Sequence, residues 1–227
     1  MSMMVRPPTT PFHPLLPTHT SQPSFALPFL NWTSGPEYKL LSANYRHLNT
    51  FIAICRDRDT GHIYRDPATG RPRIAYTPSD FDRAHNFRGI QELSKILFAH
   101  GAREIHPSLP GFTGFVRSTD DDADKEKEKQ RFEKWLAKLR AHGNKPPLTP
   151  FASAHQMGTC RMSAKAKDGV VDPRGRVWGT EGLYVADASV FPSASGVNPM
   201  ITVMAIADHI AAGLCEDLKG EGVSSRL

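Results

Sequence analysis

The stretch His155-Gln-Met-Gly-Thr-Cys-Arg-Met162 opens the part of the chain that decides its fold. Two segments follow it, Tyr184-Val-Ala-Asp-Ala-Ser-Val-Phe-Pro192 and Gly196-Val-Asn-Pro-Met-Ile-Thr202. They bring a His, an Asp and an Asn into one short region, each beside Gly, Pro or Thr. Because a neutral imidazole accepts protons near pH 7 and an amide donates hydrogen bonds, the region is a candidate for proton-transfer chemistry.

Local patterns around these segments predict a strand and a helix. The apolar run 182–186 is typical of a buried strand. A helix is predicted from Pro199 to Leu214, with Asn198 as its N-cap and Pro199 as its first helical residue. Its buried stripe consists of Val203, Ile206, Ala207, Ile210 and Leu214.

The first two thirds of the chain predict a mixture of helices and antiparallel strands. We expect a strand at 51–55, a β-hairpin at 62–76, a helix from Ser79 or Asp80 to about His100, a strand at 102–106 and a helix after the acidic run 120–124. The predicted fold class is therefore mixed α+β, with an antiparallel sheet that carries helices on one face.

Composition excludes several classes of protein. The 227 residues are 39% hydrophobic and 22% charged, which is typical of a globular protein. The net charge of +5 is spread along the chain, so we expect no nucleic-acid partner. No apolar run is long enough for a transmembrane segment. The cysteines Cys55, Cys160 and Cys215 form no CxxC pair and the histidines have no metal spacing, so we expect no metal site.

The chemistry that the C-terminal residues could serve is the oxidation of an alcohol by hydride transfer. His155 is a candidate base for the hydroxyl proton, and Asn198 could hydrogen-bond the developing alkoxide. The helix that begins at Pro199 could stabilise negative charge on a reduced flavin. Each residue also has an ordinary interpretation: His155 as a loop histidine, Asn198 as a helix cap and Asp187 as a turn residue.

Four segments in order resemble the C-terminal region of the glucose–methanol–choline (GMC) oxidoreductases, and most of all the long-chain fatty alcohol oxidase branch. They are 155–162, 170–179, 182–192 and 196–202. The resemblance implies an FAD cofactor, with His155 as catalytic base and Asn198 as second catalytic position. It also implies that Asp187, Ala188, Asn198, Pro199 and Met200 contact the cofactor. Ser163 stands where the family usually has Gly.

The resemblance also implies a division of the chain. We expect a disordered Pro-rich segment at 1–31, part of a substrate domain at 32–148, a segment at 149–218 that supplies the C-terminal strand and helix of a flavin-binding α/β fold, and a flexible tail at 219–227. No Gly-x-Gly-x-x-Gly loop is present, so the N-terminal dinucleotide-binding part of the family is missing and the chain is expected to be a C-terminal fragment.

The leading hypothesis is an FAD-dependent oxidase that converts long-chain primary alcohols to aldehydes with oxygen as acceptor. Two alternatives remain: a non-catalytic fragment, and a GMC dehydrogenase with another electron acceptor. The ending Ser225-Arg226-Leu227 is a variant of the Ser-Lys-Leu address, which favours a peroxisomal import receptor as partner and a peroxisomal location, otherwise a cytoplasmic one.

Overall fold

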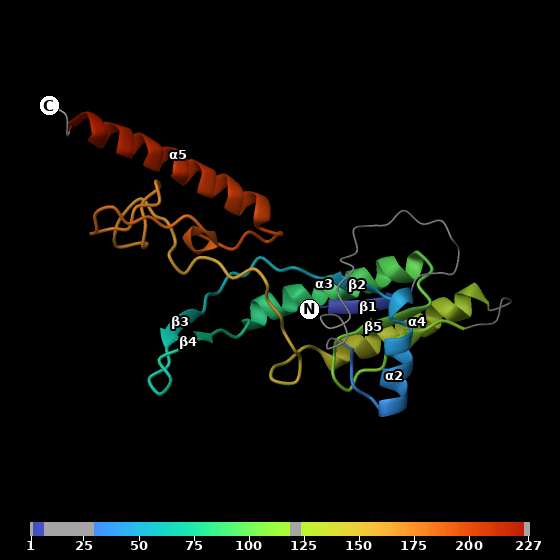
Figure 1. The fold of residues 1–227 in the computed structure, drawn as a ribbon. Helices are drawn as coiled ribbons and strands as arrows, with labels where there is room; N and C mark the ends of the chain where they lie inside the picture. The colour runs from blue at the N-terminus through green and yellow to red at the C-terminus, as the bar shows by residue number, and fades with distance from the viewer. Residues whose placement is uncertain (1, 7–29, 119–123, 225–227) are drawn as a thin grey trace. The chain divides into compact units, whose positions relative to one another are not determined.

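The computed structural model describes residues 2–6, 30–118 and 124–224. Its chain divides into two units, shown in Figure 1. The first, which we call the sheet unit, contains residues 1–55 and 80–152. The second, the C-terminal unit, contains residues 56–79 and 153–227. The mixed α+β class predicted from the sequence is confirmed, because each unit combines helical and antiparallel β structure.

An antiparallel four-stranded sheet with the order β2-β1-β5-β6 organises the sheet unit. Its strands are β1 (Ser2–Arg6), β2 (Asn49–Ile52), β5 (Glu104–Pro107) and β6 (Phe115–Val116). β1 lies between β2 and β5, with Met4 opposite Thr50 on one side and His106 on the other. The expectation that 1–31 is disordered is thus wrong for residues 2–6, because two neighbouring strands satisfy their backbone hydrogen bonds. Residues 7–29 lie outside the described part.

Three α-helices belong to the sheet unit: α2 (Gly35–Ala43), α3 (Asp80–Ala99) and α4 (Lys125–His142). A 3-10 turn, η2 (Tyr45–His47), follows α2. α3 contacts β1 and β5 and also packs against α4. The predicted bounds of α3 are confirmed to within a residue, and Asp124 caps α4 by accepting hydrogen bonds from Glu126 and Lys127.

The core of the sheet unit fills the space enclosed by α3, α4 and the sheet. Its fully buried side chains include Ile90, Ile105, Leu109, Leu136 and Leu139. Aromatic rings add to it, since Phe98 stacks on Phe132 with centroids 4.1 Å apart and Phe115 meets Phe132 edge to face. These contacts explain why the helical periodicity of the sequence was predictive here.

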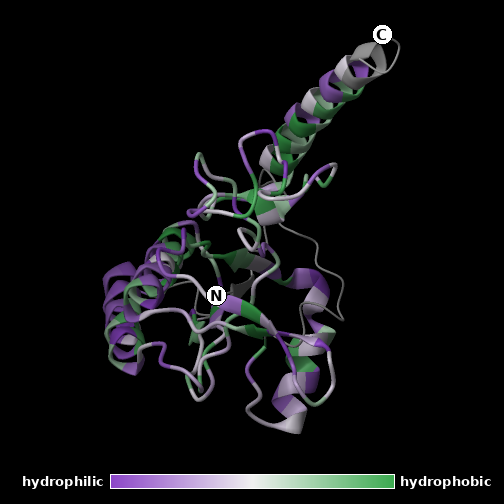
Figure 2. Ribbon diagram, turned by 90° about the vertical axis from the view of Figure 1, so that its left-hand side faces the viewer, coloured by the Kyte–Doolittle hydropathy of each residue, from purple (hydrophilic) through white to green (hydrophobic). Residues whose placement is uncertain are grey.

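The C-terminal unit contains little regular structure before its last helix. Its hairpin joins β3 (His62–Arg65) to β4 (Pro72–Ala75), as predicted, with Ile63 opposite Ile74. A short 3-10 turn, η3, spans Ala188–Val190, and the long helix α5 spans Met200–Ser224. Figure 2 shows hydrophobic residues along the first half of α5. Only Val171, Val190 and Ile210 form the buried apolar cluster described in this unit.

Three sequence predictions for this unit are corrected. Residues 182–186 form no strand. The Val177 N–H donates to the Leu183 carbonyl and the Val185 N–H to the Gly175 carbonyl, so the two segments meet across a tight loop at a single β-bridge, between Arg176 and Tyr184. The hairpin, expected in the 32–148 portion, belongs instead with the C-terminal residues. α5 continues to Ser224, so the prediction of a flexible tail from 219 is wrong up to that residue. Once a helix has formed, each further residue adds one hydrogen bond, and the helix extends in this way through Glu216, Asp217 and Lys219.

Candidate active site

His155 precedes a segment that backbone hydrogen bonds tie to a turn distant in the sequence. The imidazole is half-buried, and the His155 N–H donates to Ser153 Oγ over 3.4 Å. Further along, the N–H groups of Gly158, Cys160 and Met162 donate to the carbonyls of Ala188, Ser189 and Val190 at 3.1, 2.8 and 2.8 Å. Because alternate residues donate to successive carbonyls, the segment after His155 lies alongside η3.

Asp187 fixes the turn on which this pairing depends. Its Oδ1 accepts the Ser189 N–H over 2.8 Å and so caps η3. The hydrogen bonds that it accepts from Ser189 hold the pKa of the Asp187 carboxyl below its usual range. The interpretation of Asp187 as a turn residue is therefore correct for its side chain. Ala188, predicted beside the cofactor, provides one of the three carbonyls that hold the His155 segment.

A loop that leads to Asn198 is held by a residue far away in the sequence. Arg56 Nε donates to the Ala194 carbonyl over 2.9 Å, and its Nη2 donates to Ser193 Oγ over 3.2 Å. Gly196 has φ +70°, and a Cβ atom there would lie 2.9 Å from Arg56 Cβ. Glycine is thus required twice, for its conformation and for the close approach of Arg56. Ser195 Oγ closes the loop by donating to the Val197 carbonyl.

The residues predicted at the start of the last helix lie there, one position later than expected. α5 begins at Met200, and the Pro199 carbonyl accepts the Val203 N–H over 2.8 Å. Pro199 is therefore the cap rather than the first helical residue, and Asn198 precedes the cap. Pro199 is buried, whereas Asn198 and Met200 are exposed. That the His155 imidazole and the Asn198 carboxamide face a shared cleft stays a prediction.

A charged network fixes the other end of α5. Arg174 Nη2 donates to the Gly213 carbonyl and to Asp217 Oδ1, each over 2.8 Å, and the Tyr184 hydroxyl donates to Asp217 Oδ2 over 2.9 Å. The turn that carries Arg174 is closed by Asp172, which accepts the N–H groups of Arg174 and Arg176 and the Arg176 guanidinium. Burial raises the pKa of Asp172, but these hydrogen bonds outweigh it and hold the pKa below the usual value.

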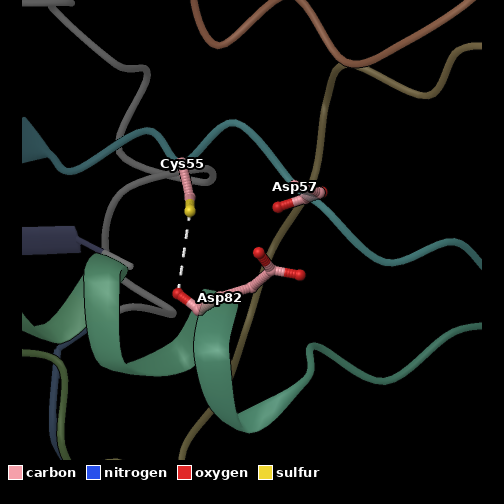
Figure 3. Close-up of side chains that lie close together, drawn as sticks. All are labelled: Cys55, Asp57 and Asp82. Atoms are coloured by element: carbon pink, nitrogen blue, oxygen red, sulfur yellow. Dashed lines mark hydrogen bonds between the residues drawn. The ribbon is translucent and has the colours of Figure 1, made fainter.

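No disulfide joins Cys55, Cys160 and Cys215 to one another. Cys160 is half-buried beside the η3 pairing, where its backbone rather than its sulfur makes the described contact. Cys55 belongs to the sheet unit, and its Sγ donates to the backbone carbonyl of Asp82 over 3.6 Å (Figure 3). Both described contacts suit thiols that fill space in the fold.

Sequence reasoning missed the residues that hold this region together. Arg56 and Arg174 are separated from their partners by more than 35 positions, and a periodic pattern carries no information on such contacts. Asp172 had a clearer local signal, because Asp-Pro-Arg-Gly at 172–175 is typical of a turn that the Asp side chain closes.

Within the described residues, no helix has both the length and the apolar character needed to cross a membrane.

Comparison with known proteins identifies the family of the chain. The family model described as GMC oxidoreductase, for the C-terminal part, matches residues 57–207. That range includes His155, Asp187 and Asn198 as well as the hairpin, all of which lie in the C-terminal unit.

Two Arabidopsis thaliana proteins named long-chain-alcohol oxidase are among the relatives. FAO3 is 35% identical over 189 residues, which cover 82% of this chain and 24% of that protein. FAO4A is 34% identical over 210 residues, which cover 90% of this chain and 27% of that protein. The chain thus spans about a quarter of the length of these relatives.

Among solved structures, pyridoxine 4-oxidase from Mesorbium loti matches 74% of this chain and 29% of its own, with 21% identity and a TM-score of 0.46. The family assignment rests on the sequence match, which extends over more than half of the chain. The expectation drawn from four short segments is thereby confirmed: the chain belongs to the GMC oxidoreductase family.

Proposed function

We propose that this chain is the C-terminal part of an FAD-dependent oxidase that converts long-chain primary alcohols to aldehydes, with oxygen as the electron acceptor. The observation that carries the proposal is the backbone pairing of residues 158–162 with η3, because it gives the loop after His155 a fixed conformation in a stretch, between α4 and η3, that contains no helix or strand. The likeness to the two Arabidopsis long-chain-alcohol oxidases supports the substrate class.

His155 is proposed as the base that takes the hydroxyl proton. A half-buried imidazole remains accessible to a substrate while its surroundings exclude part of the water. Asn198 is proposed to donate a hydrogen bond to the same oxygen as negative charge develops there. Arg56 then acts as a positioning residue, because it fixes the loop 193–196 that leads into Asn198.

The start of α5 fits the role proposed for it beside FAD. The backbone N–H groups before Val203 have no acceptor inside the helix, so they suit a partner that gains negative charge. Met200 is 67% exposed and offers an apolar surface at the same end, next to the buried Pro199. Asp187 and Ala188 are proposed to contact the cofactor through η3. FAD, when bound, supplies the acceptor for the hydride.

Oxygen as acceptor and a peroxisomal location belong to the same proposal. An oxidase releases hydrogen peroxide, and Ser225-Arg226-Leu227 is a variant of a peroxisomal address. These three residues lie outside the described part of the chain. The competing hypothesis of a GMC dehydrogenase shares His155 and Asn198 and differs only in the final acceptor.

The test uses a fusion, because the chain matches only a quarter of its relatives' length. The full chain, residues 1–227, which includes β1, replaces the matching C-terminal part of FAO3, and peroxide formation from a long-chain alcohol is measured. His155→Ala should lower the rate at least about 100-fold, the usual contribution of a general base. His209→Ala, which changes an exposed histidine on α5 of the same unit, is the matched control and should keep the parental rate.

The outcomes separate the hypotheses. Equal rates in the His155→Ala and parental fusions contradict the role of His155. A parental fusion that reduces an artificial dye in the presence of the alcohol but consumes no oxygen favours the dehydrogenase. A fusion that folds and binds FAD yet oxidises no alcohol with either acceptor favours the non-catalytic fragment.

A further inference from the structure

A shallow groove of about 330 Å³ lies on the sheet unit, beside β6 and α4. Phe115 and Trp135, both nearly buried, line it together with Val116, and Arg131, Lys134 and Lys138 surround it with positive charge. The three basic residues are spaced by three and four positions on α4, so they project from one face of that helix. The groove is not part of the proposed active site, which lies in the C-terminal unit.

Hydrogen bonds and burial fix the side chains of Phe115, Arg131 and Trp135 that line the groove. Trp135 Nε1 donates to the Thr113 carbonyl over 2.9 Å, and Phe115 is 4% exposed. Arg131 is fixed by Glu128 Oε2 at 2.6 Å and by the Val116 carbonyl at 3.2 Å. Lys134 and Lys138 are exposed and, within the described part of the chain, make neither a hydrogen bond nor an ion pair.

Charge therefore defines the kind of ligand. Glu128 neutralises Arg131, while two lysines remain for an anion. Their aliphatic stems line apolar surface, and Val116 is 50% exposed at the edge of the sheet beside them. A surface that combines unpaired ammonium groups with apolar contact suits an anionic amphiphile. The rings of Phe115 and Trp135 are too deeply buried to stack on nucleotide bases, which argues against single-stranded nucleic acid.

We propose that this groove of α4 and β6 docks the sheet unit onto the surface of an anionic lipid membrane, with Lys134 and Lys138 at the phosphate groups and Val116 at the boundary of the acyl chains. The docking goes beyond the proposed oxidation and does not depend on it. It is compatible with that chemistry, because long-chain alcohols partition into lipid. No membrane-crossing helix is needed, since peripheral binding combines apolar burial with attraction to anionic lipid.

The test is sedimentation of the full 227-residue chain with vesicles of phosphatidylcholine, with and without about 30% phosphatidylserine, a lipid that makes the surface negative. The double variant Lys134→Gln and Lys138→Gln should lower the partition coefficient for the anionic vesicles about 30-fold, from about 1 kcal/mol per basic residue near such a surface. Raising the salt concentration should weaken binding of the parent in the same direction.

The matched control is Lys125→Gln with Lys129→Gln. Both are exposed lysines on the opposite face of α4, so the control removes the same net charge from the same helix. It should bind like the parent. Inorganic phosphate, added as a competitor, should displace little protein, because it offers charge without the apolar surface.

Three results overturn the proposal. The two double variants can lose equal affinity, which shows a general charge effect. The parent can bind neutral and anionic vesicles equally or bind neither. It can also bind a single-stranded RNA oligonucleotide through Lys134 and Lys138 while it ignores vesicles, which assigns the groove to nucleic acid.

Discussion

The sheet unit and the C-terminal unit are each stabilised by a different kind of interaction. The sheet unit encloses an apolar core in which helix, strand and loop residues are fully buried. In the C-terminal unit the described buried cluster is Val171, Val190 and Ile210, and much of the rest is fixed by hydrogen bonds and ion pairs around Asp172, Arg174 and Asp217. One unit thus depends on packing and the other on polar contacts in addition to a small core.

This difference predicts how each unit responds to change. Apolar packing is insensitive to pH, whereas hydrogen bonds to carboxylates are lost when the carboxylates gain protons. α5 is an example of the second case. Its Ile210 is buried, but Met200, Ile201 and Met204 are more than 60% exposed, so the helix depends in addition on the hydrogen bonds that the Asp217 carboxylate accepts. We therefore expect acid to loosen the C-terminal unit before the sheet unit, and peptide-resolved hydrogen exchange can follow the two separately.

The largest effect is expected from the core of the sheet unit. Leu136 is fully buried among the aromatic rings of α4 and β6. Leu136→Ala should lower the free energy of unfolding of that unit by about 3 kcal/mol through lost transfer energy and a cavity. Urea titration with hydrogen exchange as the readout should show the loss in peptides from α3 and α4. Lys138→Ala, an exposed change on the same helix, serves as control. A loss shared equally by α5 would contradict the separation of the two units.

The next effect tests the polar unit in the same way. Asp172 is 6% exposed and accepts two backbone N–H groups in its turn. Asp172→Ala leaves those N–H groups without their acceptor and should cost about 2 kcal/mol. Exchange should rise in peptides around 170–186 and in α5. Asp168→Ala, an exposed aspartate in the preceding loop, is the control. Undisturbed exchange in α5 would show that the turn does not hold the helix.

Sequence patterns predicted the sheet unit better than the C-terminal unit. The apolar spacing of Ile90, Leu93 and Leu97 located α3, because a helix against a core repeats its contacts every turn. Strand β1 was missed, since residues 2–6 precede a Pro-rich stretch and pair with strands more than 40 positions away. The information for β1 lies in its partners and not in its own residues.

The candidate site was predicted as residues but not as an arrangement. Asp187, Ala188 and Pro199 were identified by resemblance, and the structure adds that the first two form the turn that holds the His155 segment. Arg56 could not be found by local reasoning, because its contact with Ala194 joins two loops without periodicity. The strand predicted at 182–186 was wrong for a related reason: this apolar run makes its backbone hydrogen bonds within a tight loop and not in a β-ladder.

A smaller effect should depend on pH. The hydrogen bonds from Ser189 lower the pKa of Asp187 in the folded chain, so the stabilisation is present above the ordinary value near 3.9 and is lost as the pH falls through the lowered pKa. Asp187→Ala should cost about 1 kcal/mol at neutral pH, as for other caps, and little in strong acid. Exchange of the 158–162 amides, followed from pH 7 into strong acid, measures it. A difference between parent and variant that stays constant over this whole range would mean that the carboxylate charge contributes nothing.

The smallest effect concerns the hydroxyl of Tyr184, which donates to Asp217 at the far end of α5. This bond holds the neutral form and raises the pKa of Tyr184, so its stabilisation is complete below the unfolded value near 10 and is lost as the pH rises through the higher folded value. Tyr184→Phe should weaken the α5 peptides less than Asp187→Ala weakens 158–162, and parent and variant should converge in alkali. Tyr64→Phe, on β3 of the same unit, is the control. Because Arg174 also binds Asp217, the attachment of α5 to the turn that carries Arg174 should persist without the hydroxyl. Complete loss of exchange protection in the α5 peptides of Tyr184→Phe would show instead that the tyrosine, and not the arginine, secures the helix.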